Sequence, residues 1–182
     1  MTPGVRKFAL TAHVTSSVGW FGSVAAFLAL AIAGLTSQST ELVRAAYLTM
    51  DLTGWYVIVP LSFAALLTGL VQSLGTTWGL FQHYWVLIKL LIAIFATVLL
   101  LIHMRPIDHV AGVAARATLL PGELRGLLVQ LIFDAGAALL VLLVATTLSV
   151  YKPKGLTRYG WRKQGDQRAA ARNSAMSAAD RQ

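Results

Sequence analysis

Four long apolar stretches are the feature of this sequence that most limits its fold. They cover about residues 8–34, 52–74, 80–103 and 127–150. Each is long enough to cross the hydrocarbon core of a bilayer, which takes about 20 helical residues. Because lipid offers no hydrogen-bond partners, a backbone that crosses it forms helices that satisfy their own polar groups. The sequence therefore predicts an all-α fold, an integral membrane bundle of four transmembrane helices.

The composition supports this prediction. Hydrophobic residues make up 57% of the chain and charged residues only 12%. A soluble domain of this size would not have enough polar surface to cover so much apolar material. The chain has no cysteine, which excludes disulfides, iron–sulfur clusters and thiolate metal sites. The first apolar stretch is also longer than the ~7–15 apolar residues of a secretory signal, so we expect it to be a retained helix.

The sequence predicts a transmembrane domain over residues 1–151 and a basic cytoplasmic tail over 152–182, which we expect to be either disordered or associated with the membrane. The second helix is expected to begin near Thr40, ahead of the membrane. Pro60 falls inside the second span, where it removes a backbone donor and is expected to bend the helix. The connection over 104–126 is expected to be a loop that holds a short surface helix.

The basic residues indicate how the chain is oriented. Arg6 and Lys7 precede the first span, and a run of lysines and arginines follows the fourth. The positive-inside rule then places both termini in the cytoplasm, which an even number of spans allows (N-in/C-in). The formal charge of +8 gathers at the chain ends rather than on one amphipathic face. We interpret it as a topology signal and as contacts to lipid headgroups in a bacterial inner membrane, and not as a nucleic-acid site.

Ionisable side chains within the spans are costly in lipid, so they are the natural candidates for function. His13, His83 and Lys89 are all expected in the cytoplasmic half of the bundle. Asp134 lies in the outer half of the fourth span. Each also has a simpler interpretation. His83 is compatible with an aromatic belt at the headgroups, and Lys89 with a side chain that extends to the surface. Asp134 could be protonated or hydrogen-bonded within the bundle.

The first helix carries a polar stripe. His13, Ser16, Ser17 and Trp20 recur at three- and four-residue spacing and therefore share one face. Thr15, Gly19 and Ser23 add a run of small residues that would let another helix approach closely.

Two histidines on different helices at similar depth are what a b-type haem needs, because its axial ligands come from opposite sides of the ring plane. On this hypothesis His13 is one ligand of the iron and either His83 or Lys89 is the other. Trp20 and Trp85 would line the pocket.

Two segments resemble known bacterial membrane families. The first is LTAHVTSSVGWFG, residues 10–22, and the second is LTGLVQSLGTTWGLFQHYWVLIKLLIAIFATVLLLIH, residues 67–103. Together they are similar to copper-resistance D-type membrane domains, to HemJ-type protoporphyrinogen oxidases and to DUF2269-like integral membrane proteins. The resemblance implies a shared four-helix scaffold and an association with haem, with His13 and Lys89 at matching positions. The chain departs from the HemJ-type pattern after Trp20, and His83 is additional, so neither activity is carried over.

The sequence therefore predicts a membrane protein that binds haem and acts in electron transfer or membrane redox chemistry. Two alternatives stay open. In the first, Asp134 and Lys89 form a path for protons or metal ions, and His103 and His109 collect cations outside. In the second, the chain is an accessory subunit whose first helix binds a partner membrane protein or a second copy. No P-loop, dinucleotide fingerprint, zinc-protease helix or nucleophile elbow points to a conventional enzyme.

Overall fold

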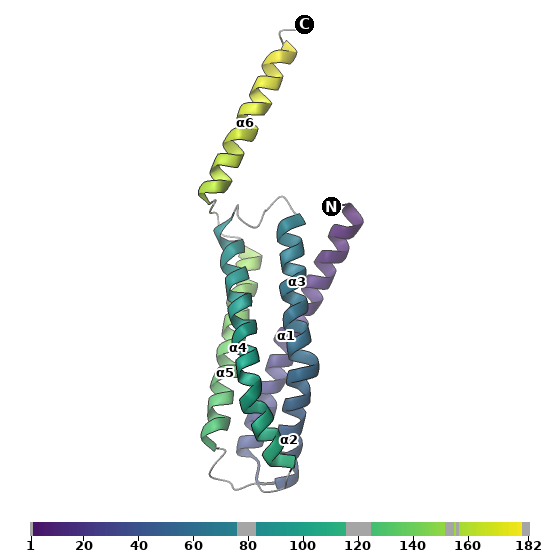
Figure 1. Ribbon diagram of the computed structural model, residues 1–182, viewed down its shortest axis with the longest axis vertical. Coiled ribbons are helices and arrows are strands. Elements are labelled where there is room, and N and C mark those ends of the chain that lie inside the picture. Colours follow the sequence, from purple (N-terminus) through teal and green to yellow (C-terminus); the bar gives the residue numbers. More distant parts are fainter. Residues whose placement is uncertain (1, 76–82, 116–124, 152–154, 156, 180–182) are drawn as a thin grey trace.

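The computed structural model describes residues 2–75, 83–115, 125–151, 155 and 157–179. Figure 1 shows an all-helical chain with these elements: α1 (Pro3–Thr36), α2 (Thr40–Thr53), η1 (Gly54–Ile58), α3 (Val59–Gly75), α4 (Tyr84–Ala115), α5 (Arg125–Tyr151) and α6 (Arg158–Ala179). Elements α2, η1 and α3 follow one another without a break and form one continuous helical rod. Together with α1, α4 and α5, the described chain thus has four helical rods that are long and apolar enough to cross a membrane. The prediction of an all-α chain with four membrane-length helices is confirmed.

The four rods form an antiparallel bundle. Helix α1 packs against α3 and α5, and α4 packs against the same two helices. The start of α1 and the end of α5 therefore lie at one end, which we name the terminal end, and the chain reverses between α1 and α2 and after α4 at the opposite, loop end (Figure 1). The start of α1 and the end of α5 lie at the same end of the bundle, which agrees with an even number of membrane crossings. Which side faces the cytoplasm stays a prediction.

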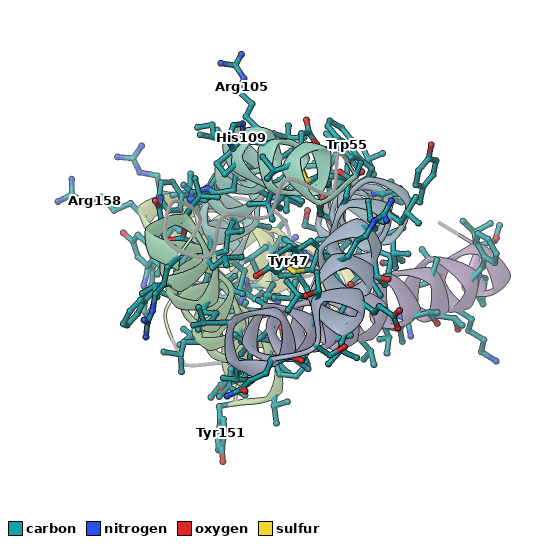
Figure 2. All side chains as sticks on the ribbon, turned by 90° about the horizontal axis from the view of Figure 1, so that it is seen from below. Tyr47, Trp55, Arg105, His109, Tyr151 and Arg158 are labelled. Atoms are coloured by element: carbon teal, nitrogen blue, oxygen red, sulfur yellow. The ribbon has the colours of Figure 1, made fainter. Side chains whose placement is uncertain are left out.

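The loop end is closed by an interaction between α1 and α2. Ser39 caps α2, because its hydroxyl accepts from the backbone N–H of Leu42 at 3.4 Å. The Tyr47 hydroxyl then donates to the carbonyl oxygen of Gly34 at 3.0 Å. In Figure 2, seen from this end, Tyr47 lies inside the ring of helices. As predicted, α2 begins at Thr40.

Helix α4 is longer than expected. It continues through Pro106 to Ala115, where the sequence predicted a loop over 104–126 that held a separate short helix. The reason is a stripe of side chains at helical spacing that are buried in the same core as Ala46, Tyr47 and Met50 of α2: Met104, Ile107, Val110 and Ala114. Burial of this stripe offsets the one hydrogen bond that Pro106 cannot donate.

A π-helical turn precedes Pro60. Over Gly54–Ile58 the chain is π-helical, and the N–H of Val59 bonds to the carbonyl oxygen of Gly54, five residues back. Proline lacks an N–H and its ring conflicts with the carbonyl four residues earlier, so a wider turn at this point relieves the conflict. The sequence predicted a bend at Pro60, and the structure has a π turn directly before it. Trp55 of this turn lies on the rim of the bundle in Figure 2.

The apolar core occupies the middle and loop end of the bundle. From α1 it takes Trp20, Val24, Phe27 and Ala31, and these pack with Met50, Met104, Leu128 and Leu131 from the other three rods. The ionisable residues predicted for the cytoplasmic half lie nearer the terminal end, beyond this core.

The tail contains a helix. The sequence predicted a tail that is either disordered or associated with the membrane. In the structure Arg158–Ala179 is helical and projects from the terminal end (Figure 1). Thr157 caps it, accepting from the backbone N–H of Gly160 at 3.1 Å. The segment is rich in alanine, arginine and glutamine, all strong helix formers, and this local preference favours a helix.

Gly34 and Gly22 offer a matched test of the contact between α1 and α2. A Cβ at Gly34 would clash with Cε1 of Tyr47, whereas a Cβ at Gly22, on the same helix, meets nothing within 4 Å. We expect Gly34→Ala to destabilise the protein by about 1–3 kcal/mol through overpacking, and Gly22→Ala to leave its stability unchanged or slightly raised. The measurement is the Tm of the detergent-solubilised protein. Equal Tm values for the two variants would contradict the contact.

Candidate functional site

His13 is held against α3 by its ring nitrogen Nδ1. That atom lies 3.1 Å from the carbonyl oxygen of Ala65 and 3.2 Å from Oγ1 of Thr68. A carbonyl oxygen can only accept, so Nδ1 carries the proton and a neutral ring keeps its lone pair on Nε2. Gly69 allows this approach, because a Cβ there would lie 3.0 Å from Cε1 of His13. His13 is therefore half-buried, oriented, and has a lone pair on a defined nitrogen.

The hydroxyls of the polar stripe on α1 are used by the helix itself. Oγ of Ser16 donates to the carbonyl oxygen of His13 at 3.1 Å, and Oγ of Ser23 donates to that of Trp20 at 2.9 Å. Ser17 is half-buried. The indole of Trp20, predicted to line a haem pocket, is 5% exposed and packs in the apolar core. The stripe thus shares one face, as expected, and His13 is its member that bonds to another helix.

Lys89 lies between α4 and α5. Its Nζ donates to Oγ of Ser149 at 3.0 Å and sits 4.6 Å from the centroid of the Trp85 ring. The His83 ring is 6.1 Å from the same indole, tilted by 58°. Trp85 is buried, so a lysine and a histidine approach one shielded aromatic ring. The structure thus brings together three predicted site residues: His83, Trp85 and Lys89.

Four helices contribute to this terminal-end cluster, which we define as His13 on α1, Thr68 on α3, Lys89 on α4 and Ser149 on α5, together with His83 and Trp85. His13 and Lys89 lie on α1 and α4, which both pack against α3 and α5. The expectation that the polar residues of spans 1 and 3 share one half of the bundle agrees with this arrangement. Trp20 lies deeper, about 10 Å beyond His13 along α1 at ~1.5 Å per residue.

The loop-end half holds a second polar interaction, between His103 and Asp134. Nε2 of His103 lies 2.8 Å from Oδ2 of Asp134, and its Nδ1 lies 2.8 Å from the carbonyl oxygen of Leu99. Nδ1 donates to that carbonyl oxygen, so Nε2 is the ring nitrogen that faces the carboxyl. The contact places the acidic side chain of α5 beside a histidine of α4 rather than against lipid.

A third polar group lies on the rim of the loop end. Nε1 of Trp55, in the π turn, donates to Oδ1 of Asp108 at 2.8 Å. The carboxyl of Asp51 lies near that of Asp108. The interaction links the second rod to α4 beyond the predicted third span. His103 and His109, suggested as cation collectors, differ in their surroundings: His103 is paired with Asp134, and His109 is exposed on the rim (Figure 2).

Sequence reasoning missed the pair of His103 and Asp134. A signal was present, since α4 and α5 run antiparallel and both residues lie a few turns from their loop-end termini. The contact of Trp55 with Asp108 had no comparable signal, because the predicted third span ended before Asp108. Within the described part of the chain, no three His, Asp or Glu side chains gather closely enough to hold a metal ion between them.

Comparison of the chain with models of protein families finds no match, and neither does comparison with curated proteins or with solved structures. The site is therefore interpreted from its own residues.

The pair of His103 and Asp134 can be tested with a double-mutant cycle. We expect His103→Leu to lower stability by about 1–3 kcal/mol, because it leaves Asp134 without its partner. The double variant His103→Leu/Asp134→Leu should recover most of that loss. Asp134→Asn should be nearly neutral, since an amide can donate to Nε2. Thermal unfolding in detergent provides the measurement, and strictly additive single effects would contradict the pairing.

Proposed function

We propose that the protein binds b-type haem in the terminal half of its bundle and acts in electron transfer within the membrane, with His13 as one axial ligand. The observation that carries this proposal is the hydrogen bond from Nδ1 of His13 to the carbonyl oxygen of Ala65. Histidines that ligate metals commonly donate their other ring N–H to such an oxygen, which orients the ring and sets its tautomer. The donor chemistry of His13 therefore fits an axial ligand.

The contacts of Lys89 support His83 as the second ligand. Lys89 donates to Ser149 and lies over the face of Trp85, which is the behaviour of an ammonium group. An ammonium has no lone pair to offer to iron, whereas a neutral imidazole has one. In this proposal Lys89 supplies a positive charge for the carboxylates of the porphyrin. Bound haem would supply one-electron transfer at a potential set by its ligands and surroundings.

The same proposal places the terminal end in the cytoplasm of a bacterial inner membrane. Arg6 and Lys7 begin α1, and the basic helix α6 follows α5 at the same end. This distribution of basic residues around the membrane-crossing helices is the one that the positive-inside rule associates with the cytoplasm.

An ion path is less well supported. It requires Asp134 and Lys89 to act along one route. Asp134 instead pairs with His103, and Lys89 bonds to Ser149, which lies fifteen residues after Asp134 on α5. At a rise of ~1.5 Å per residue that separation is about 22 Å. The helix faces between them are mostly apolar, so neither group can pass a proton directly to the other.

The accessory-subunit alternative depended on the small residues of α1. A Cβ at Gly19 would lie 3.2 Å from Cδ1 of Leu61, so the chain's own α3 occupies this face. The contact of His13 with Gly69 continues the same interface between α1 and α3. Gly19 is therefore in contact with the chain's own α3, whereas Thr15 of the same run is exposed.

Absorption spectroscopy tests the haem proposal directly. The purified protein, expressed with ample haem, should show a Soret band and sharp α and β bands on reduction with dithionite. His13→Ala should lose most of the bound haem, and the matched control His109→Ala, at the exposed rim, should keep it. Size-exclusion profiles show whether each variant remains folded. A wild-type protein that stays colourless after titration with haem would overturn the proposal.

The identity of the second ligand gives a separate prediction. We expect His83→Ala to retain haem but to convert its spectrum from low-spin to high-spin, because one axial position loses its nitrogen. Lys89→Met keeps the length of the side chain without its charge and should remain low-spin. A high-spin spectrum in the Lys89 variant together with a normal one in the His83 variant would reverse this assignment.

A further inference from the structure

Helix α6 has no partner among the described helices. It projects from the terminal end (Figure 1), and no other element packs against it. Between Arg158 and Ala179 the sequence holds five basic residues and one acidic residue, Asp166. Such a basic helix follows a membrane-crossing helix, and most of its described side chains are exposed, so it has a surface available for an external partner.

The exposed basic side chains gather on one side of α6. Relative to Arg158, the residues Arg162, Arg172 and Met176 lie at i+4, i+14 and i+18, all close to whole numbers of helical turns. Trp161 and Arg168, at i+3 and i+10, flank the same side. All six side chains are exposed, Trp161 at 64% and Met176 at 58%. We name this set the cationic face of α6: Arg158, Trp161, Arg162, Arg168, Arg172 and Met176.

The connection to α5 limits what this face can reach. Helix α5 ends at Tyr151 and α6 begins at Arg158. The six residues between them can span at most about 20 Å at ~3.5 Å per residue. The start of α6 therefore stays close to the surface of the bilayer that α5 crosses. Tethering makes docking on that surface intramolecular, so weak contacts are enough to hold the helix there.

We propose that α6 docks along the membrane surface at the terminal end, with its cationic face on anionic lipid headgroups. Arginine binds phosphate oxygens through two parallel hydrogen bonds, and tryptophan is favoured at the level of the headgroups. Docking requires α6 to lie along the membrane rather than along the bundle axis. This inference does not depend on haem binding.

Site-directed spin labelling of the full-length protein tests this proposal. The chain has no cysteine, so Met176→Cys on the cationic face and Gln167→Cys on the opposite side each give a single labelling site. The protein is reconstituted in phosphatidylcholine bilayers with or without phosphatidylglycerol. With the anionic lipid, we expect the label at 176 to become accessible to oxygen and shielded from a water-soluble relaxation agent. The label at 167 should stay in water in both bilayers.

Charge removal separates this proposal from other modes of binding. Each basic residue near an anionic surface strengthens partitioning onto the membrane by about fivefold. A quadruple variant, in which Arg158, Arg162, Arg168 and Arg172 are all replaced by Gln, should therefore dock several-hundredfold more weakly. The control Arg105→Gln, at the loop end, should change nothing, and high salt should release the wild-type helix.

Three outcomes would overturn the proposal. A label at 176 that stays in water in both bilayers would show that no docking occurs. Shielding that persists in pure phosphatidylcholine, or in the fourfold variant, would show an apolar contact without headgroup recognition. Shielding that appears in phosphatidylcholine only after RNA is added would assign the cationic face to nucleic acid.

Discussion

Lipid offers no hydrogen bonds, so every polar group in the bundle has to find its partner within the chain. Most hydroxyls do so locally. Ser62 donates to the carbonyl of Val59 in its own helix and Thr97 to that of Ala93, and Ser16 and Ser23 do the same on α1. Hydroxyls used in this way carry little chemistry. The polar groups that reach across to another helix, chiefly His13, Lys89, His103 and Asp134, are the ones that set both the packing and the candidate sites.

The spans could be predicted because length and hydropathy alone determine them. Wherever the structure describes them, all four fall within the helical rods, apart from His83, which directly precedes α4. The approximate depth of each ionisable residue followed from the helical rise and the direction of each span. The end of α4 could not be predicted, because Pro106 is a strong local signal for a boundary. The competing signal was the burial of Ile107, Val110 and Ala114, which depends on α2 lying beside them.

The pairing of side chains was harder to predict for a related reason. A membrane-crossing helix is apolar on all sides, so its sequence does not indicate which face points inward. Rotation about the helix axis decides whether Asp134 meets His103 or faces lipid, and that rotation is set by packing against neighbouring helices. Gly69 shows this dependence clearly. In sequence it is one of fifteen glycines, and only the position of His13 against it gives it a role.

Charge is divided between the two ends of the bundle. The acidic residues of the membrane-crossing rods, Glu41, Asp51, Asp108 and Asp134, all lie toward the loop end. There Asp134 pairs with His103, and Asp108 accepts a hydrogen bond from Trp55. Arg6, Lys7 and Lys89 lie toward the terminal end, where α6 adds further basic residues. The formal charges of the rods at the terminal end are therefore positive, and they stabilise an anionic ligand there. In the two proposals that ligand is a porphyrin carboxylate beside Lys89 or a lipid headgroup beneath α6. A cation would be repelled there, which is why the charge distribution favours both proposals over a cation path through the same residues.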